Sequence, residues 1–356
     1  MSRVKVDTER LKANAERLSA LVGDFYCVVK CDAYGHGIEE CVKALFETGR
    51  RKFAVYSIDE AVRVKSVARE AEVLILGRTP SRYLPSVADN GFVQTVFSVE
   101  YAEEVRASGS VPSLHVKLDT GMNRTGFCGD AEEILRAFSG SEGAIKGVYT
   151  HFNCADAPSL SVALGQLEEF KERASKLEAM LGAPLVKHAA ATAAALRIKE
   201  ARLDMCRIGL GIYGVLPDNC EGLCELAPVM SFTAPTVSLR WVKKGQTVGY
   251  GCDTVLSRDS YIATVSVGYG FGLPRSARGF SPYICGVRVP IIGRICMDRC
   301  MLDLSDALDS GLSVRVGDRA EFISDKLPVS ELSAAEGTVP YETLCRIGRM
   351  NKIRKG

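Results

Sequence analysis

The stretch that decides the fold is Phe-Tyr-Cys-Val-Val-Lys-Cys-Asp-Ala-Tyr-Gly-His-Gly, residues 25–37. It opens with an apolar, β-prone run that ends at Lys30, and Tyr34-Gly35-His36-Gly37 comes soon after. This turn lacks the GxGxxG pattern with which open, doubly wound sheets bind dinucleotides. The first strand therefore favours a different parallel architecture, one in which functional side chains gather where strands end.

Seven more apolar runs follow at fairly regular intervals, with helical patterns between them. The helical patterns cover Ile38–Leu45, Asp59–Ala68 and Leu160–Leu181, the last of which stops at Gly182. Eight strand–helix repeats predict an α/β fold, a (β/α)8 TIM barrel over residues 1–222. The eight expected strands are Phe25–Lys30, Phe53–Ser57, Val73–Gly77, Val93–Phe97, Leu114–Leu118, Ile145–Phe152, Leu185–Ala189 and Met205–Tyr213.

The character of the sequence changes after residue 222. Apolar runs continue, but helical periodicity becomes scarce and Gly and Pro punctuate the chain. This pattern predicts a second, mainly β domain over residues 223–356. The expected strands are Val229–Val242, Ser260–Val267, Tyr283–Ile292, Cys300–Leu304 and Arg319–Ile323.

Composition excludes several classes of protein. The 356 residues include 45 basic and 43 acidic side chains, a net charge of +2, which argues against nucleic-acid or acidic-membrane partners. No apolar stretch is long enough to span a bilayer, and Met1–Leu21 lacks the apolar core of a secretory signal. The 13 cysteines include no CxxC pair, so we expect reduced thiols in the cytoplasm and no metal site.

Three strand ends carry side chains that could do chemistry. Lys30 either reaches solvent or forms a Schiff base, and position alone leaves both open. His151, after the sixth strand, could be a hydrogen-bonded core residue or a catalyst. Arg207 precedes Gly209 and Gly211 in a pattern typical of phosphate sites after the last barrel strands. Together they favour a phosphorylated, imine-forming cofactor, namely pyridoxal phosphate.

Four motifs then resemble the alanine racemase family, in the right order and over nearly the whole chain. They are Val29–Gly37, Lys117–Phe127, Arg207-Ile208-Gly209 with Tyr213-Gly214, and Gly293–Asp298. The resemblance implies a (β/α)8 barrel followed by a β domain, as the residue patterns do independently. It also implies racemisation of alanine, which supplies D-alanine for peptidoglycan.

The resemblance assigns roles to individual residues. Lys30 would carry pyridoxal phosphate and act as a base on one face of the substrate α-carbon, and Tyr250 would act on the other face. Lys117 matches a lysine that is carbamylated in some members. The remaining matches are His151 beside Tyr250; Arg207 at the pyridine nitrogen; Tyr34, Thr192, Gly209, Leu210 and Tyr341 around the phosphate; and Arg124 with the Met297 backbone at the substrate carboxylate.

The family's active site is shared between two subunits. The resemblance therefore implies a homodimer in which the β domain of the partner subunit completes the site with Tyr250, Cys296, Met297 and Asp298. Tyr269, Arg275 and Arg294 would line its access channel.

Some residues depart from the family pattern. Ala191 stands where asparagine is usual, and Phe271 and Leu273 replace an acid and an aromatic residue of the access channel. These changes leave open a racemase for serine or a larger amino acid. A related barrel decarboxylase would carry glutamate in place of Arg207, and a non-enzymatic carrier of the cofactor would lack residues 223–356.

Overall fold

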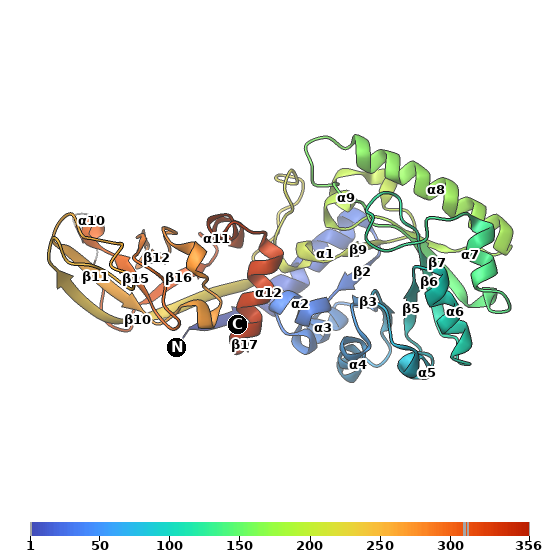
Figure 1. Cartoon of the computed structure of the whole chain (residues 1–356), viewed down its shortest axis with the longest axis horizontal. Helices are drawn as coiled ribbons and strands as arrows, with labels where there is room; N and C mark the ends of the chain where they lie inside the picture. The colour runs from blue at the N-terminus through green and yellow to red at the C-terminus, as the bar shows by residue number, and fades with distance from the viewer. Residues whose placement is uncertain (1, 309–310, 312, 356) are drawn as a thin grey trace. The chain divides into compact units, whose positions relative to one another are not determined.

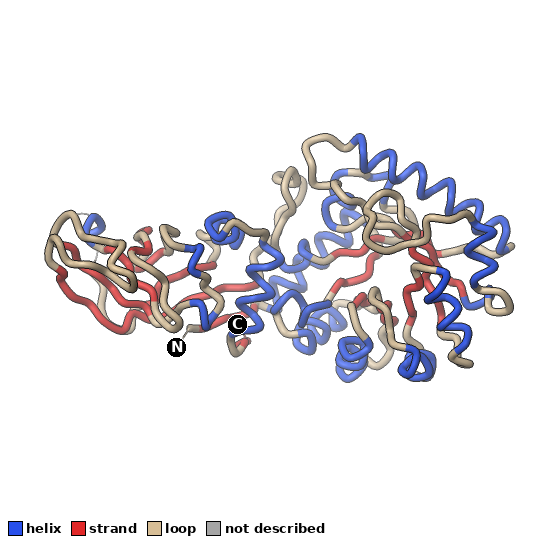
Figure 2. The backbone as a smooth tube through the Cα atoms, in the orientation of Figure 1, coloured by secondary structure: helices blue, strands red, loops and turns tan. Residues whose placement is uncertain are grey.

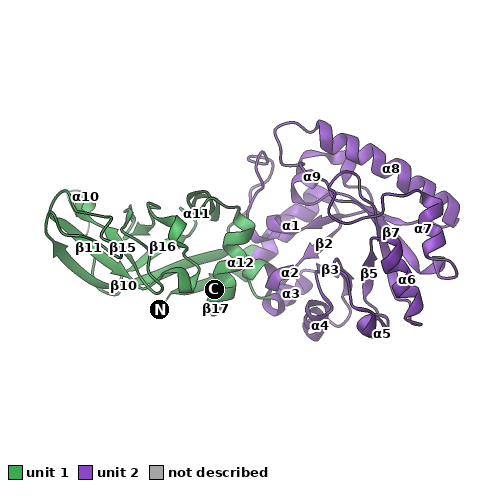
Figure 3. Ribbon diagram, in the orientation of Figure 1, with its two compact units in different colours: residues 1–10, 34–37, 227–356 green, residues 11–33, 38–226 purple. Residues whose placement is uncertain are grey.

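The structure is a computed structural model that describes residues 2–308, 311 and 313–355. Its chain forms two compact units, coloured purple and green in Figure 3. The barrel unit comprises Leu11–Ala33 and Ile38–Leu226, and the C-terminal unit comprises Met1–Arg10, Tyr34–Gly37 and Ala227–Gly356. The division thus differs from a single cut at residue 222, because two short N-terminal segments belong to the C-terminal unit.

The barrel unit is built on a parallel eight-stranded sheet (Figure 1). Its order is β8-β7-β6-β5-β4-β3-β2-β9, which follows the sequence without the reversal of a doubly wound sheet. Two backbone bonds, Asp204 N to Lys187 O at 3.2 Å and Arg207 N to Ala190 O at 2.9 Å, join the segments of β8 and β9. The predicted barrel is confirmed. Its strands are β2 (Phe25–Val28), β3 (Lys52–Val55), β4 (Glu72–Ile75), β5 (Val93–Val96), β6 (Ser113–Lys117), β7 (Ile145–Tyr149), β8 (Val186–His188) and β9 (Cys206–Ile208).

Local sequence signals set the helix boundaries in this unit. The side chains of Ser57, Ser98 and Asp130 cap helices by accepting backbone N–H bonds from the first turn. Gly182 ends α8 with a positive φ of 67°, where glycine avoids the strain of a Cβ. The three predicted helices are confirmed to within three residues. The helices are α1 (Thr8–Val22), α3 (Ile38–Glu47), α4 (Ile58–Val67), α5 (Leu84–Asp89), α6 (Val99–Ala107), α7 (Ala131–Ala137), α8 (Ser161–Leu181) and α9 (Thr192–Arg197), with 3-10 turns η1 (Ser81–Tyr83), η2 (Glu142–Ala144), η3 (Lys199–Ala201) and η4 (Leu210–Tyr213).

The C-terminal unit contains a mostly antiparallel sheet of order β13-β12-β16-β10-β11-β15-β14, which Figure 2 shows as its red segments. Strand β1 adds to β10, with Val4 opposite Phe232, and it also pairs in parallel with β17, where Val4 is opposite Ile353. The mainly β prediction is confirmed, but the expected strand Tyr283–Ile292 is three short pieces. The strands are β1 (Arg3–Val6), β10 (Met230–Val242), β11 (Ser260–Val265), β12 (Tyr283–Ile284), β13 (Val287–Arg288), β14 (Ile291–Ile292), β15 (Cys300–Asp303), β16 (Arg319–Ile323) and β17 (Ile353–Lys355).

The sequence does not predict the helices α11 (Val329–Glu336) and α12 (Pro340–Met350) of this unit. The buried face of α12 combines Thr343 and Gly348 with Leu344 and Ile347, so the helix is amphipathic and its short sequence does carry the helical period. Short elements complete the unit: α10 (Ser305–Leu308), η5 (Tyr269–Phe271) and η6 (Arg275–Ala277). Across the described residues of both units, no helix is both long and apolar enough to cross a membrane.

The turn α2 (Lys30–Gly35) is left-handed. Cys31, Asp32, Ala33 and Tyr34 have φ between 54° and 56°, and Gly35 follows at 80°. L-residues in this conformation cost about 1–2 kcal/mol each, so the turn requires support. The Asp32 carboxylate provides it by accepting bonds from Ile38 N at 3.1 Å and from Arg63 Nη2 at 2.6 Å.

Backbone contact with α12 fixes the far end of this turn. A Cβ on Gly348 would lie 1.9 Å from the Gly35 carbonyl oxygen, and one on Gly35 would lie 2.4 Å from the Leu344 carbonyl oxygen. Neither position has room for a side chain, so both glycines are required for α12 to reach the turn.

Alanine substitution of two helical glycines should therefore have opposite effects. Gly348→Ala should lower the free energy of unfolding by about 1–3 kcal/mol, because its methyl group clashes with Gly35. The exposed Gly165 of α8 has nothing within 4 Å of its Cβ position, so Gly165→Ala should raise stability by about 0.5–1 kcal/mol. Urea unfolding of both variants tests this, and equal stability changes would contradict it.

Candidate active site

The predicted barrel residues lie at or just beyond the carboxyl ends of the parallel strands. Lys30 begins α2 two residues after β2, and His151 lies two residues after β7. Arg207 is the middle residue of β9. Carboxyl ends of barrel strands are where active sites of this fold are built.

Arg207 is a buried cation with neutral partners. Its Nη1 donates to the carbonyl oxygen of His188 at 2.9 Å and lies 2.8 Å from that residue's Nδ1. Its Nη2 donates to the carbonyl oxygens of Thr150 at 2.7 Å and Ala189 at 3.1 Å. The guanidinium also packs over the Tyr149 ring. Burial lowers the pKa of Arg207 to about 10, which still leaves it charged at neutral pH.

Two buried histidines extend from this arginine. Because a guanidinium can only donate, His188 Nδ1 is the acceptor and its Nε2 carries the proton. That Nε2 lies 2.9 Å from Nδ1 of His115 and donates its proton to it. The neutral His115 ring therefore also carries its own proton on Nε2. Burial first, and then the Arg207 charge, lower the pKa of His115 to about 4 and shift the pKa of His188 well below its usual value. Both rings are therefore neutral at pH 7.

His151 lies among the cations of the site. Its Nδ1 is 3.2 Å from Arg207 Nη2 and accepts from it, so the neutral ring carries its proton on Nε2. Burial and the nearby charges of Arg207, Arg124, Lys117 and Lys30 hold the pKa of His151 well below its ordinary value. Four predicted cationic residues thus lie close enough to His151 to affect its pKa, and the neutral His151 ring can donate a hydrogen bond from Nε2.

Lys117, the last residue of β6, has a pKa that is lowered toward neutral pH. Its Nζ donates to the backbone oxygen of Thr125 at 2.6 Å and to its hydroxyl at 2.8 Å. Burial, followed by the charges of Arg124 and Arg207, lowers the pKa of Lys117 to about 8. Arg124 itself is exposed in the loop after β6.

The predicted phosphate residues of the barrel unit come from two helical N-termini. Thr192 begins α9, and Gly209 precedes η4, which begins at Leu210. Gly211 N donates to the Thr192 hydroxyl at 3.4 Å, and a Cβ on Gly211 would come within 2.9 Å of the Thr192 methyl group. Backbone N–H groups of two first turns are thereby brought together, an arrangement that suits an anion.

The other predicted residues lie in the C-terminal unit. There the rings of Tyr34 and Tyr341 are 6.0 Å apart between centroids. Tyr250, in the hairpin between β10 and β11, is 71% exposed, and Met297, in the loop between β14 and β15, is 62% exposed.

Comparison with known proteins gives these features a family. Residues 6–217 match the alanine racemase N-terminal domain, and residues 229–354 match the alanine racemase C-terminal domain. The chain belongs to the alanine racemase family. An alanine racemase of Desulfosudis oleivorans is 33% identical over 376 residues, covering 98% of this chain and 95% of that protein.

Solved structures of alanine racemases agree along the full length. The biosynthetic alanine racemase of Pseudomonas aeruginosa has a TM-score of 0.89 and 31% identity, with 100% of this chain and 99% of that chain covered. The alanine racemase of Bartonella henselae, with covalently bound pyridoxal phosphate, has a TM-score of 0.90 and 26% identity, with coverage of 100% and 99%. The fold expected from the family resemblance is confirmed.

The sequence assigns no role to three residues that surround Arg207 in the structure, His188, His115 and Tyr149. Their signal is a polar or aromatic residue facing inward from an otherwise apolar strand, which gains meaning only when the neighbouring strands are placed. The Tyr149 ring stacks on His188 with centroids 4.7 Å apart, so it completes the surroundings of Arg207.

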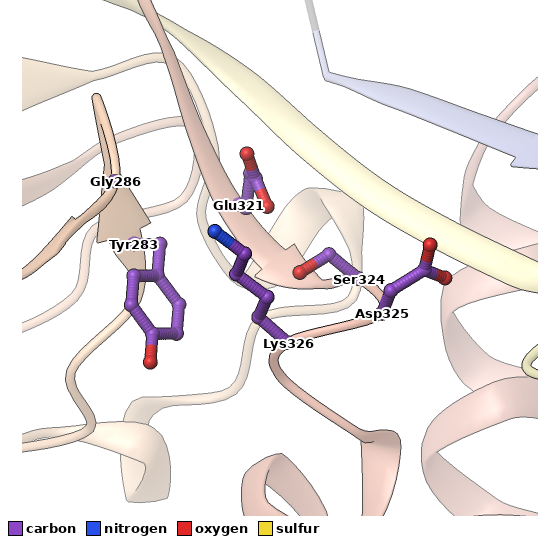
Figure 4. Close-up of a pocket in the computed structure, with 6 residues that line it drawn as sticks. All are labelled: Tyr283, Gly286, Glu321, Ser324, Asp325 and Lys326. Carbon is purple, nitrogen blue, oxygen red and sulfur yellow. The ribbon is translucent and has the colours of Figure 1, made fainter.

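A pocket of about 210 Å³ in the C-terminal unit contains none of the predicted site residues. In Figure 4 Lys326 extends between Tyr283 and Glu321, whereas Asp325 points to the other side. The Asp325 carboxylate is already paired with Arg10. Within the described ranges, no group of three or more His, Cys, Asp or Glu side chains is placed to hold a metal ion.

Acid should destabilise the barrel through the histidine pair. The folded pKa of His115, about 4, is below its unfolded value of about 6.5, so its stabilisation is present above pH 6.5 and is lost as pH falls toward 4. Each such group makes stability fall by about 1.4 kcal/mol per pH unit in that window. His115→Asn keeps an acceptor for His188 and should remove about one proton from the slope. Urea unfolding followed by circular dichroism between pH 4.5 and 7.5 measures it; an unchanged slope would refute the assignment.

Proposed function

We propose that this protein is a pyridoxal-phosphate-dependent alanine racemase that interconverts L- and D-alanine by a two-base mechanism. The observation that carries the proposal is the buried Arg207, a permanent donor surrounded by neutral acceptors at the end of the barrel. We further propose that it acts in the cytoplasm and supplies D-alanine for peptidoglycan, as the family resemblance implies.

The residues of the barrel fit the cofactor. Lys30 would hold it covalently, Arg207 would face its pyridine nitrogen, and the paired N-termini of α9 and η4 suit its phosphate. The bound cofactor supplies an electron-withdrawing ring that makes the substrate's α-hydrogen acidic. The residues that would hold the phosphate are Tyr34, Thr192, Gly209, Leu210 and Tyr341.

The charge state of Arg207 separates racemisation from the decarboxylase alternative. With a pKa of about 10 the guanidinium stays protonated at neutral pH, so it cannot give or take a proton as a carboxylic acid would. An acceptor atom placed against it stays unprotonated. A cofactor ring whose nitrogen stays unprotonated would withdraw electrons from the substrate only weakly. Weak withdrawal favours removal and return of one proton over more extensive rearrangement of the substrate.

Two bases on opposite faces complete the mechanism. Lys30 removes or returns the α-proton on one face, and Tyr250 of the partner subunit serves the other in the proposed homodimer. His151 is suited to support that tyrosine, because its neutral ring presents an Nε2 proton that can be donated to a phenolate oxygen. Neutral His151 also avoids competing with either base for the proton.

The substrate carboxylate would be held by Arg124 and the Met297 backbone. Lys117 lies within electrostatic reach of Arg124, and its lowered pKa makes the neutral amine accessible for the carbamate seen in some family members. Tyr341 would limit the side-chain pocket to small groups. Pockets of this kind separate substrates that differ by a methylene through only about 1–3 kcal/mol, so serine should be a weaker substrate.

Removal of either base gives distinct results. Lys30→Ala should abolish the visible absorption of the bound cofactor together with racemisation. Tyr250→Phe should keep the absorption but slow α-hydrogen exchange with solvent for one enantiomer, since the base on one face is lost. Nuclear magnetic resonance in heavy water measures the exchange, with Tyr83→Phe as an exposed tyrosine control. Racemisation by Lys30→Ala, or equal exchange of both enantiomers by Tyr250→Phe, would overturn these roles.

Substrate choice is tested by mixing the protein and pyridoxal phosphate with L-alanine, L-serine or L-lysine and following optical rotation. We expect rapid loss of rotation with alanine, slower loss with serine and none with lysine. If another amino acid loses its rotation faster than alanine, that amino acid is the substrate and the proposal of alanine is wrong. Cofactor absorption without racemisation would favour the decarboxylase or the carrier.

A further inference from the structure

Tyr250 sits at the tip of a narrow hairpin between β10 and β11. Backbone bonds close the hairpin below it, from Leu256 N to Gln246 O at 2.9 Å and from Val248 N to Thr254 O at 3.0 Å. Gly249, Gly251 and Cys252 have φ of 79°, 86° and 52°, so the tip doubles back on itself through left-handed backbone. The tip itself lies beyond these closing bonds, and something else must fix it.

Arg294 lies against this tip. A Cβ on Gly251 would be 2.7 Å from the Arg294 guanidinium carbon, and a Cβ on Gly249 would be 3.1 Å from the Arg294 backbone nitrogen. The two glycines that flank Tyr250 therefore both lie against Arg294, and the Met301 methyl group would also be 3.0 Å from a Cβ on Gly249. The position of the Arg294 guanidinium consequently limits where the tip can go.

One carboxylate holds that guanidinium in place. Asp253 Oδ2 accepts from Arg294 Nε at 2.9 Å and from Arg278 Nη1 at 3.2 Å. Arg278 also donates from Nη2 to the hydroxyl of Thr254 at 2.9 Å, next to Asp253 in the hairpin. The hydrogen bond from Arg294 and both positive charges keep the pKa of Asp253 below its ordinary value, so the carboxylate is ionised at neutral pH.

We propose that Asp253 is a positioning residue for Tyr250. By bridging Arg294 and Arg278 it fixes the surface on which the tip rests, and so fixes the direction of the Tyr250 side chain. The inference rests on the proposed function, because it matters for catalysis only if Tyr250 is a base. Without the carboxylate, two guanidinium groups face one another unneutralised and Arg294 is free to leave the tip.

The expected effect is local. Asp253, Arg278 and Arg294 keep side-chain exposures of 32%, 46% and 39%, and ion pairs of that exposure add little to overall stability. Misplacement of a reacting group by about 1 Å can nevertheless reduce a rate about 100-fold. Asp253 should therefore affect the turnover that depends on Tyr250 far more than the unfolding of the domain.

Asp253→Asn in the cofactor-loaded enzyme tests this. We expect α-hydrogen exchange to fall at least about 10-fold for the enantiomer that Tyr250→Phe slows, mainly through kcat, with less than a twofold change for the other. Asp253→Glu, which retains the charge, should recover part of the loss. Asp306→Asn is the control, because Asp306 pairs with Arg258 at 2.5 Å, at the base of the same hairpin rather than at its tip.

Amide hydrogen exchange of residues 248–254, the hairpin tip, gives a readout independent of turnover. Asp253→Asn should raise the exchange rate of this segment about 10-fold, and Asp306→Asn should leave it unchanged. The proposal is overturned if Asp253→Asn matches Asp306→Asn in both measurements, or if both enantiomers slow equally. A wild-type protein that exchanges neither enantiomer would instead overturn the proposed function and the catalytic part of this inference, while amide exchange alone would still decide whether Asp253 holds the tip.

Discussion

The left-handed backbone from Cys31 to Tyr34 is the constraint around which much of this molecule is arranged. Four consecutive L-residues at positive φ do not persist unless their surroundings hold them. Asp32 does so from within the turn through Arg63 and the start of α3, and α12 does so by direct backbone contact at Gly35. The result is a compact turn that begins with Lys30 and reaches Tyr34 in four residues. A residue proposed to bond the cofactor and a residue proposed to hold its phosphate are thus fixed by one short, stiff segment.

Charge organises the barrel end in a similar way. Arg207 remains cationic, whereas His115, His151 and His188 are kept neutral by burial and by that same cation. Burial, helped by this charge, keeps the rings neutral, and the guanidinium sets the tautomer of the two rings hydrogen-bonded to it, His151 and His188. Arg124 and Lys117 add positive potential, so the site is prepared for anions while its histidines act as donors. A phosphate and an amino-acid carboxylate are the anions that the proposed reaction brings.

The sequence predicted the strands and the domain types, because the spacing of apolar residues distinguishes strands from helices. It also predicted that the candidate residues Lys30 and His151 follow strands, because each comes directly after an apolar run. It did not reveal the handedness of α2, since Cys31-Asp32-Ala33-Tyr34 contains no glycine to mark positive φ. The relay from Arg207 to His115 was also hidden, because it joins residues on strands β9, β8 and β6 that are far apart in the chain. The sequence did not predict strand β1 for a related reason. Four residues with two valines are too short a pattern to indicate a strand, and the valines are buried only because β1 pairs with β10.

The pairing of β1 has a consequence for the order of assembly. Val4 is hydrogen-bonded in one sheet with Phe232 and Ile353, partners that are 228 and 349 positions later in the chain. On a ribosome the first strand is therefore made long before either of these partners exists. The eight barrel strands, by contrast, pair largely with their immediate predecessors. In this topology the slow step is the long-range pairing of β1 with β10 and β17. It comes at the end of folding, after the locally connected barrel strands have formed.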